Sequence, residues 1–117
     1  MGKVAVVGFS QGGCLALHCA ADSAVDCVVC LSSFLPDDSG VRDALGASGG
    51  PPVFMGHGSS DTMVPAAWGA QTCEWLRQHG GGRAVSWKLY QRVAHDLTME
   101  MCADVLAFVL TTFGRRR

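Results

Sequence analysis

One stretch near the N-terminus constrains the fold of this chain more than any other. Residues 3–7 form a mostly apolar run of strand length that leads into Gly8-Phe9-Ser10-Gln11-Gly12-Gly13. Residues 14–21 then predict a helix. A strand, a G-x-S-x-G motif and a helix in this order place the serine at the apex of a sharp, strained turn. We expect Gly8 and Gly12 to flank it because a Cβ at either position would collide where strand and helix approach closely.

The hydroxyl of Ser10 is expected to point away from the sheet, at the N-terminus of the following helix. Such a group suits either nucleophilic catalysis or the binding of a phosphate by a glycine-rich turn. We favour the nucleophile, because the chain carries neither G-x-G-x-x-G nor the Lys-Ser/Thr motif of a phosphate-binding loop.

Length and composition narrow the class of protein. A chain of 117 residues forms one domain at most, so we expect a single domain over 1–117. Apolar residues make up 49% and the formal net charge is −1, which predicts a globular protein and gives no electrostatic basis for binding nucleic acid. Neither a transmembrane run nor the apolar region of a signal peptide is visible, so we expect a cytoplasmic protein.

The cysteines fit the same compartment. Most of the six lie inside apolar runs, as buried thiols do, which favours a reduced chain. Cys27 and Cys30 form C-x-x-C within a predicted strand, where residues three apart face opposite sides. That placement argues against a zinc or redox site, and we expect neither a metal nor an organic cofactor.

Strands and helices alternate along the chain. The patterns predict strands at 3–7, 25–31, 53–55 and 84–90. They predict helices at 14–21, at 41–45, from after Pro65 to His79, and after Thr98, which is the expected N-cap of the last helix. The last helix carries an apolar stripe at Cys102, Val105, Leu106, Val109, Leu110 and Phe113. This order predicts an α/β fold with a mostly parallel sheet. The first three strands are continuously apolar, whereas the fourth alternates and is expected nearer an edge.

Two further residues complete a candidate triad with Ser10. A serine hydroxyl needs a base to take its proton, and the base needs a carboxylate to orient it. Such groups are expected on loops after parallel strands. Asp61 follows the third strand and His95 the fourth. The order Ser10, Asp61, His95 is that of α/β-hydrolases.

The other candidates fit less well. His57 precedes Asp61 in its loop, and we expect it to support that loop rather than to act as the base. His18 and His79 lie on predicted helices. Asp96 is adjacent to His95, and neighbouring loop residues rarely align for the required hydrogen bond. For the oxyanion hole, the N–H of Gln11 is one candidate donor, while the second normally comes from a loop after an earlier strand, which this sequence does not contain.

Four motifs together resemble the acyl-protein thioesterase and lysophospholipase family. They are Gly8-Phe9-Ser10-Gln11-Gly12-Gly13, Leu31-Ser32-Ser33-Phe34-Leu35-Pro36, His57-Gly58-Ser59-Ser60-Asp61 with Val64-Pro65, and His95 before the last helix. The second motif and His95-Asp96-Leu97 look closest to the lysophospholipase-like branch. Arg92-Val93-Ala94 before His95 departs from the family, where glycine is common.

The resemblance implies the C-terminal half of an α/β-hydrolase fold, with helices on both faces of the sheet and without the N-terminal strands. It implies hydrolysis of acyl thioesters or carboxylic esters, with an acylated protein, a lysolipid or a small ester as substrate. Ser10 would be the nucleophile, His95 the general base and acid, and Asp61 the orienting carboxylate. No cofactor is implied.

The missing strands leave a second hypothesis open, a truncated and non-catalytic form with at most a binding role. Only one oxyanion donor is identified, and the 3–7 strand would lack a neighbour on one side. An open edge of this kind is where self-association could occur. We therefore expect the chain by itself to be a poor hydrolase.

Overall fold

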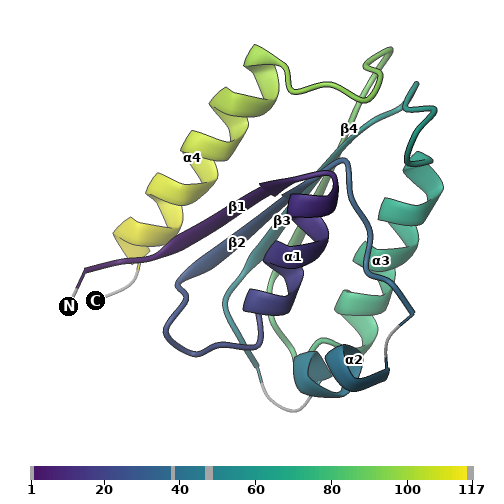
Figure 1. Ribbon diagram of the computed structural model, residues 1–117. Coiled ribbons are helices and arrows are strands. Elements are labelled where there is room, and N and C mark those ends of the chain that lie inside the picture. The colour runs from purple at the N-terminus through teal and green to yellow at the C-terminus, as the bar shows by residue number, and fades with distance from the viewer. Residues whose placement is uncertain (1, 38, 47–48, 116–117) are drawn as a thin grey trace.

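A computed structural model describes residues 2–37, 39–46 and 49–115. Its described strands form one parallel four-stranded sheet in the order β1-β2-β3-β4 (Figure 1). The elements are β1 (Ala5–Phe9), α1 (Gln11–Cys19), β2 (Cys27–Leu31), α2 (Ser39–Gly46), β3 (Val53–Gly58), α3 (Ala66–His79), β4 (Val85–Tyr90) and α4 (Met99–Arg115). The predicted order of elements and the parallel sheet are confirmed, and β4 lies at an edge as expected.

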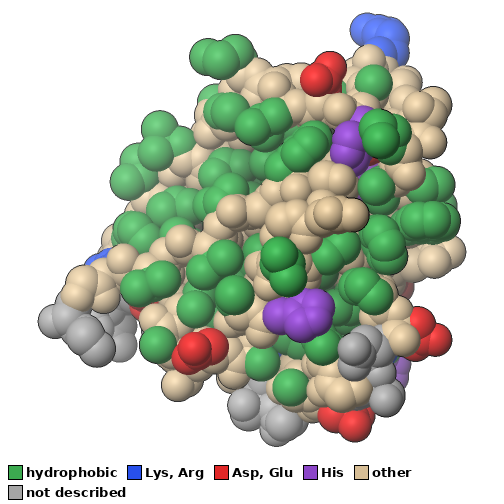
Figure 2. All heavy atoms as spheres, in the orientation of Figure 1, with side chains coloured by type: hydrophobic (Ala, Val, Ile, Leu, Met, Phe, Trp, Pro, Cys, Tyr) green, Lys and Arg blue, Asp and Glu red, His purple; other side chains and the backbone are tan. Residues whose placement is uncertain are grey.

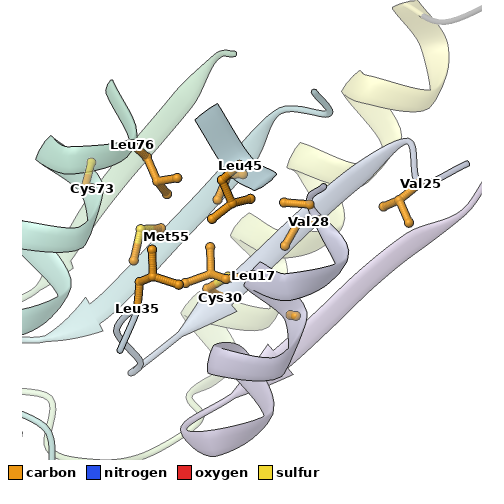
Figure 3. Close-up of a cluster of buried hydrophobic side chains, with 12 residues drawn as sticks. Leu17, Val25, Val28, Cys30, Leu35, Leu45, Met55, Cys73 and Leu76 are labelled. Atoms are coloured by element: carbon orange, nitrogen blue, oxygen red, sulfur yellow. The ribbon is translucent and has the colours of Figure 1, made fainter. Parts of the chain in front are cut away.

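Helices cover both faces of the sheet. Helices α1, α2 and α3 lie on one face and α4 on the other (Figure 1). The larger core lies under α1, α2 and α3, where Leu17, Met55 and Leu76 converge (Figure 3). The smaller one lies between the sheet and α4, around Val29, Leu31 and Phe54. Strands β2 and β3 are buried along their whole length, which is why their sequences are apolar on both faces.

All four strands differ from the sequence prediction at one or both ends. Strand β1 begins at Ala5 rather than at residue 3, and β4 begins at Val85 rather than at residue 84. Strand β1 reaches Phe9 because Phe9 pairs with Leu31. Strand β2 begins at Cys27 rather than at residue 25. Strand β3 continues beyond the apolar run to Gly58, which pairs with Tyr90 at the end of β4. Hydrogen bonding between neighbouring strands determines where each strand begins and ends. The hydrophobicity of the sequence does not reveal that pairing.

Helix α4 has the predicted cap but a different buried face. The Met101 N–H donates to Thr98 Oγ1 over 3.2 Å, which confirms Thr98 as the N-cap. Val105 and Val109 of the predicted stripe pack on the sheet, whereas Leu106 and Leu110 are each 59% exposed. Only part of the predicted apolar stripe is therefore buried. Met101, Phe108 and Thr112 lie toward the sheet in their place.

An exposed apolar face results along α4 and β1. Among the described strands β1 pairs only with β2, and Val7 is 51% exposed. A groove of about 470 Å³ runs between this strand and α4, with Val7, Leu97 and Leu106 in its lining. Figure 2 shows hydrophobic side chains gathered over the same two elements. The described helices include none that is long and apolar enough to span a membrane.

Arg83 joins several loops at the end of the molecule away from Ser10. Its guanidinium is buried and donates to the carbonyls of Gly80, Ala20, Leu45 and Pro51. Burial lowers the pKa of this side chain. Carbonyl oxygens that would otherwise lack a partner in the interior are satisfied in this way. These contacts leave no pattern in the sequence, because the partners are backbone carbonyls and three of the four lie more than 30 residues away.

Three of the six cysteines are buried, as expected from their positions in apolar runs. Cys27, Cys30 and Cys73 are buried, Cys14 and Cys19 are half-buried, and Cys102 is exposed. Burial raises the pKa of the Cys30 thiol. All six lie within the described residues, and none of them forms a disulfide.

Candidate active site

Ser10 occupies the turn between β1 and α1 in a strained conformation. Its φ of 58° and ψ of −122° lie outside the regions that residues with a side chain normally adopt. The turn is held from both sides: the Ser10 N–H donates to the Leu31 carbonyl over 2.8 Å, and the Ser10 carbonyl accepts from Gly13 over 2.9 Å. The sharp turn predicted from the G-x-S-x-G motif is confirmed.

The glycines around Ser10 do not play equal parts. A Cβ on Gly8 would collide with the backbone of Gly12 and lie 2.6 Å from the Gly13 nitrogen. A Cβ on Gly12 would meet nothing within 4 Å, so the prediction of a collision there is wrong. Gly13 takes that place, because its Cβ would collide with the Ser33 side chain on the loop after β2. The start of α1 therefore approaches β1 through the backbone of Gly12 and the loop after β2 through Gly13.

The structure brings Ser10, His95 and Asp61 together in one line of hydrogen bonds. Nε2 of His95 lies 3.0 Å from Ser10 Oγ, and Nδ1 of His95 lies 2.8 Å from Asp61 Oδ2. The three residues follow β1, β4 and β3 and meet at the carboxyl edge of the sheet. The ring of Phe9 packs against that of His95 with 4.9 Å between centroids. His95 is thereby oriented from three directions.

Asp61 is buried and fully satisfied. Its Oδ1 accepts hydrogen bonds from the backbone N–H groups of Met63 (2.9 Å) and Val64 (2.8 Å), while Oδ2 faces His95. Burial would raise the pKa of this carboxyl, but the hydrogen bonds from Val64, His95 and Met63 outweigh burial and lower the pKa below its ordinary value of 3.8. Asp61 is therefore a carboxylate at neutral pH.

The alternative candidates stand outside the hydrogen bonds that join Ser10, His95 and Asp61. His57 is buried and donates from Nε2 to the Val64 carbonyl over 2.8 Å, so it contacts the loop that carries Asp61, as expected. His18 is exposed and contacts the Cys14 carbonyl in its own helix. Asp96 is exposed, and the carboxylate that meets His95 Nδ1 is that of Asp61. His79 is exposed at the end of α3.

One contact that positions the site was missed from the sequence. Ser59 ties the loop after β3 to the loop after β4, since its Oγ accepts from the Arg92 N–H over 2.8 Å. Arg92 has a φ of 62°, in the left-handed region that favours glycine. The non-glycine residues before His95, noted in the sequence as a departure, are thus held by a side chain from a neighbouring loop.

A cleft of about 430 Å³ opens beside Ser10 and His95. Its other walls are mostly apolar, and they are formed by Gln11, Cys14, Phe34, Pro36, Met63, Val64 and Trp68. Phe34 and Trp68 pack edge to face with 5.0 Å between ring centroids. Gln11 begins α1, where the first backbone N–H groups lack carbonyl partners within the helix. An oxygen anion formed at Ser10 would find that N–H nearby.

Relatives of this chain are found among hydrolases. The acyl-protein thioesterase 1 of Candida albicans is 33% identical over 92% of this chain and 48% of its own length. The lysophospholipase-like protein 1 of Mus musculus is 33% identical over 93% of this chain and 46% of its own length. The chain thus spans about half the length of the curated relatives that it matches.

Solved structures show the same fold. The acyl-protein thioesterase 2 of Zea mays superimposes with a TM-score of 0.81 and 23% identity, over 94% of this chain and 56% of that one. TT1662 from Thermus thermophilus does so with a TM-score of 0.80 and 27% identity, over 96% and 55%. The sheet described above is therefore about half of an α/β-hydrolase fold. Residues 1–113 match the Phospholipase/Carboxylesterase family, and this chain belongs to that family of hydrolases.

Proposed function

We propose that this chain carries the catalytic triad of a serine hydrolase that cleaves acyl thioesters or carboxylic esters. The observation that carries the proposal is the line of contacts from Ser10 Oγ to His95 (3.0 Å) and on to Asp61 (2.8 Å). The order of partners is that of a nucleophile, a base and an orienting acid.

The geometry suits catalysis through an acyl-enzyme. Ser10 Oγ attacks the substrate carbonyl while its proton passes to His95 Nε2. Asp61, held as a carboxylate, accepts a hydrogen bond from His95 Nδ1 and stabilises the charged ring. The N–H of Gln11 donates to the oxyanion. His95 then returns the proton to the departing thiol or alcohol, and water attacks the acyl-enzyme with His95 again as the base.

The substrate class follows from the cleft and from the relatives. Apolar side chains line most of the cleft beside Ser10, which suits an acyl group. Relatives named as acyl-protein thioesterase and lysophospholipase-like protein direct the proposal to acylated proteins, lysolipids or small esters. The chemistry uses no metal or organic cofactor.

Covalent labelling of Ser10 tests the proposal directly. A fluorophosphonate should react with the folded protein at Ser10, because that hydroxyl contacts His95 Nε2. The variant Ser10→Ala should not be labelled, whereas Ser33→Ala, at a buried serine outside the line of contacts, should be labelled as before. Mass spectrometry of the labelled peptides identifies the modified residue. Equal labelling of Ser10→Ala would refute the proposal.

A hydrolysis assay separates a competent hydrolase from a form without catalysis. The comparison is between residues 1–117 alone and a fusion in which a thioesterase relative supplies the half that this chain does not match. We expect residues 1–117 alone to hydrolyse an aryl ester or acyl thioester at least about 10²-fold more slowly than the fusion. The reason is that an α/β-hydrolase takes its second oxyanion donor from a loop after an earlier strand.

The exposed apolar face along β1 and α4 should also make residues 1–117 self-associate, which analytical sedimentation measures. A monomer with equal kcat/KM would contradict this expectation.

A further inference from the structure

A second histidine is buried beside Asp61, and its two ring nitrogens have different surroundings. His57 lies in β3 and is 1% exposed. Its Nε2 lies 2.8 Å from the Val64 carbonyl oxygen, and a carbonyl can only accept, so Nε2 carries the hydrogen. Its Nδ1 is buried and has no hydrogen-bond partner among the described residues. The ring is held as the Nε2–H tautomer.

Among the described residues, the neighbours of the ring offer Nδ1 no hydrogen-bond acceptor. Helix α3 presents Gly69, whose Cβ, if it had one, would lie 2.5 Å from Nδ1. Strand β4 presents the ring of Trp87, 6.1 Å away between centroids. Among the described residues, the charged group that faces His57 is Asp61, with 3.6 Å between Nε2 and Oδ2. A proton on Nδ1 would be a buried donor without an acceptor, which is costly.

Val64 connects His57 to Asp61. The carbonyl of Val64 accepts from His57 Nε2, and its N–H donates to Asp61 Oδ1 over 2.8 Å. A shift of Val64 would therefore loosen Oδ1 and rotate the carboxylate, whose Oδ2 is aimed at His95 Nδ1. Because the Val64 carbonyl is bonded to His57 and the Val64 N–H to Asp61, the position of the His57 ring affects the position of the Asp61 carboxylate.

We propose that His57 is a positioning residue, which holds Val64 in place and so keeps the Asp61 carboxylate aimed at His95. It takes no proton from the substrate or from Ser10. The inference deepens the proposed function and rests on it, since the role of Asp61 defines what is positioned.

Two substitutions separate the hydrogen bond from the volume of the ring. His57→Phe keeps a ring but removes the donor to Val64, and we expect kcat to fall about 10²-fold with KM little changed, as for a misplacement of about 1 Å in a catalytic group. His57→Gln can still donate to the Val64 carbonyl and should retain most of the activity. His79→Phe, at an exposed histidine, is the matched control.

Readouts that need no turnover test the positioning itself. In the unaltered protein, ¹⁵N NMR should show one pyrrole-like and one pyridine-like nitrogen for His57. Hydrogen exchange at the Val64 N–H should be faster in His57→Phe and unchanged in His57→Gln. If His57→Phe does not fold, His57→Gln and the NMR of the unaltered protein still decide the outcome.

The inference is overturned by a protonated Nδ1 on His57, by an unchanged exchange rate at Val64 in His57→Phe, or by an unchanged kcat in that variant. Equal damage from His57→Gln and His57→Phe would also overturn it, because the donor would then not be what matters. If the protein is neither labelled nor active, the proposed function fails, and the NMR and exchange results still test whether His57 holds the Asp61 loop.

Discussion

The variant Asp61→Asn is expected to lower kcat about 10⁴-fold, the loss known for this change in a serine protease. The reason is that the two oxygens of the carboxylate have different hydrogen-bond partners. Oδ1 accepts from the N–H groups of Met63 and Val64, so the amide oxygen of an asparagine must take that place. The amide NH₂ then faces His95 Nδ1, where Oδ2 now lies. Nδ1 becomes an acceptor, Nε2 carries the hydrogen, and His95 can no longer take the proton of Ser10.

The measurement is kcat on an aryl ester, in the chain joined to the unmatched part of a relative if the chain alone is inactive. Asp96→Asn is the matched control, because Asp96 is the neighbour of His95 in sequence and is exposed. We expect this control to keep nearly all activity. A mild loss in Asp61→Asn together with a severe loss in Asp96→Asn would assign the orienting role to Asp96.

The variant Gly8→Ala is expected to reduce the rate of fluorophosphonate labelling at Ser10 by about 10² or more, since a shift of about 1 Å in a reacting group has this effect. The added methyl would collide with the backbone of Gly12 and approach the Gly13 nitrogen to 2.6 Å. Backbone atoms cannot rotate away as a side chain can. The start of α1 must therefore move away from β1, and the Ser10 hydroxyl and the Gln11 N–H move with it.

The control for this variant is Gly12→Ala, the other glycine of the motif. A Cβ there meets nothing within 4 Å, and alanine favours a helix more than glycine does by about 1 kcal/mol. We expect its labelling rate to stay close to that of the unaltered protein and its melting temperature not to fall. Equal loss in both variants would show that the motif requires glycine for a reason other than this contact.

The sequence by itself determined the class of fold, the order of the elements and the turn at Ser10. Each of these features depends on residues that lie within a few positions of one another: an apolar run of strand length, the glycines beside Ser10, or Thr98 at the start of its helix. Such local patterns can be recognised directly in the sequence. The candidates Ser10, Asp61 and His95 could be selected for a related reason, because parallel strands bring the loops that follow them to one edge.

Only the tertiary structure decided how closely those residues meet and which other groups hold them in place. The hydrogen bond between Ser59 and Arg92, the close approach of Gly13 to Ser33 and the contacts of Arg83 all join segments far apart in the chain. The exposed side of α4 is a further example, since its apolar stripe is wider than the sheet beneath it covers. Periodicity shows that a helix has an apolar face, but the packing partner determines how much of that face is buried.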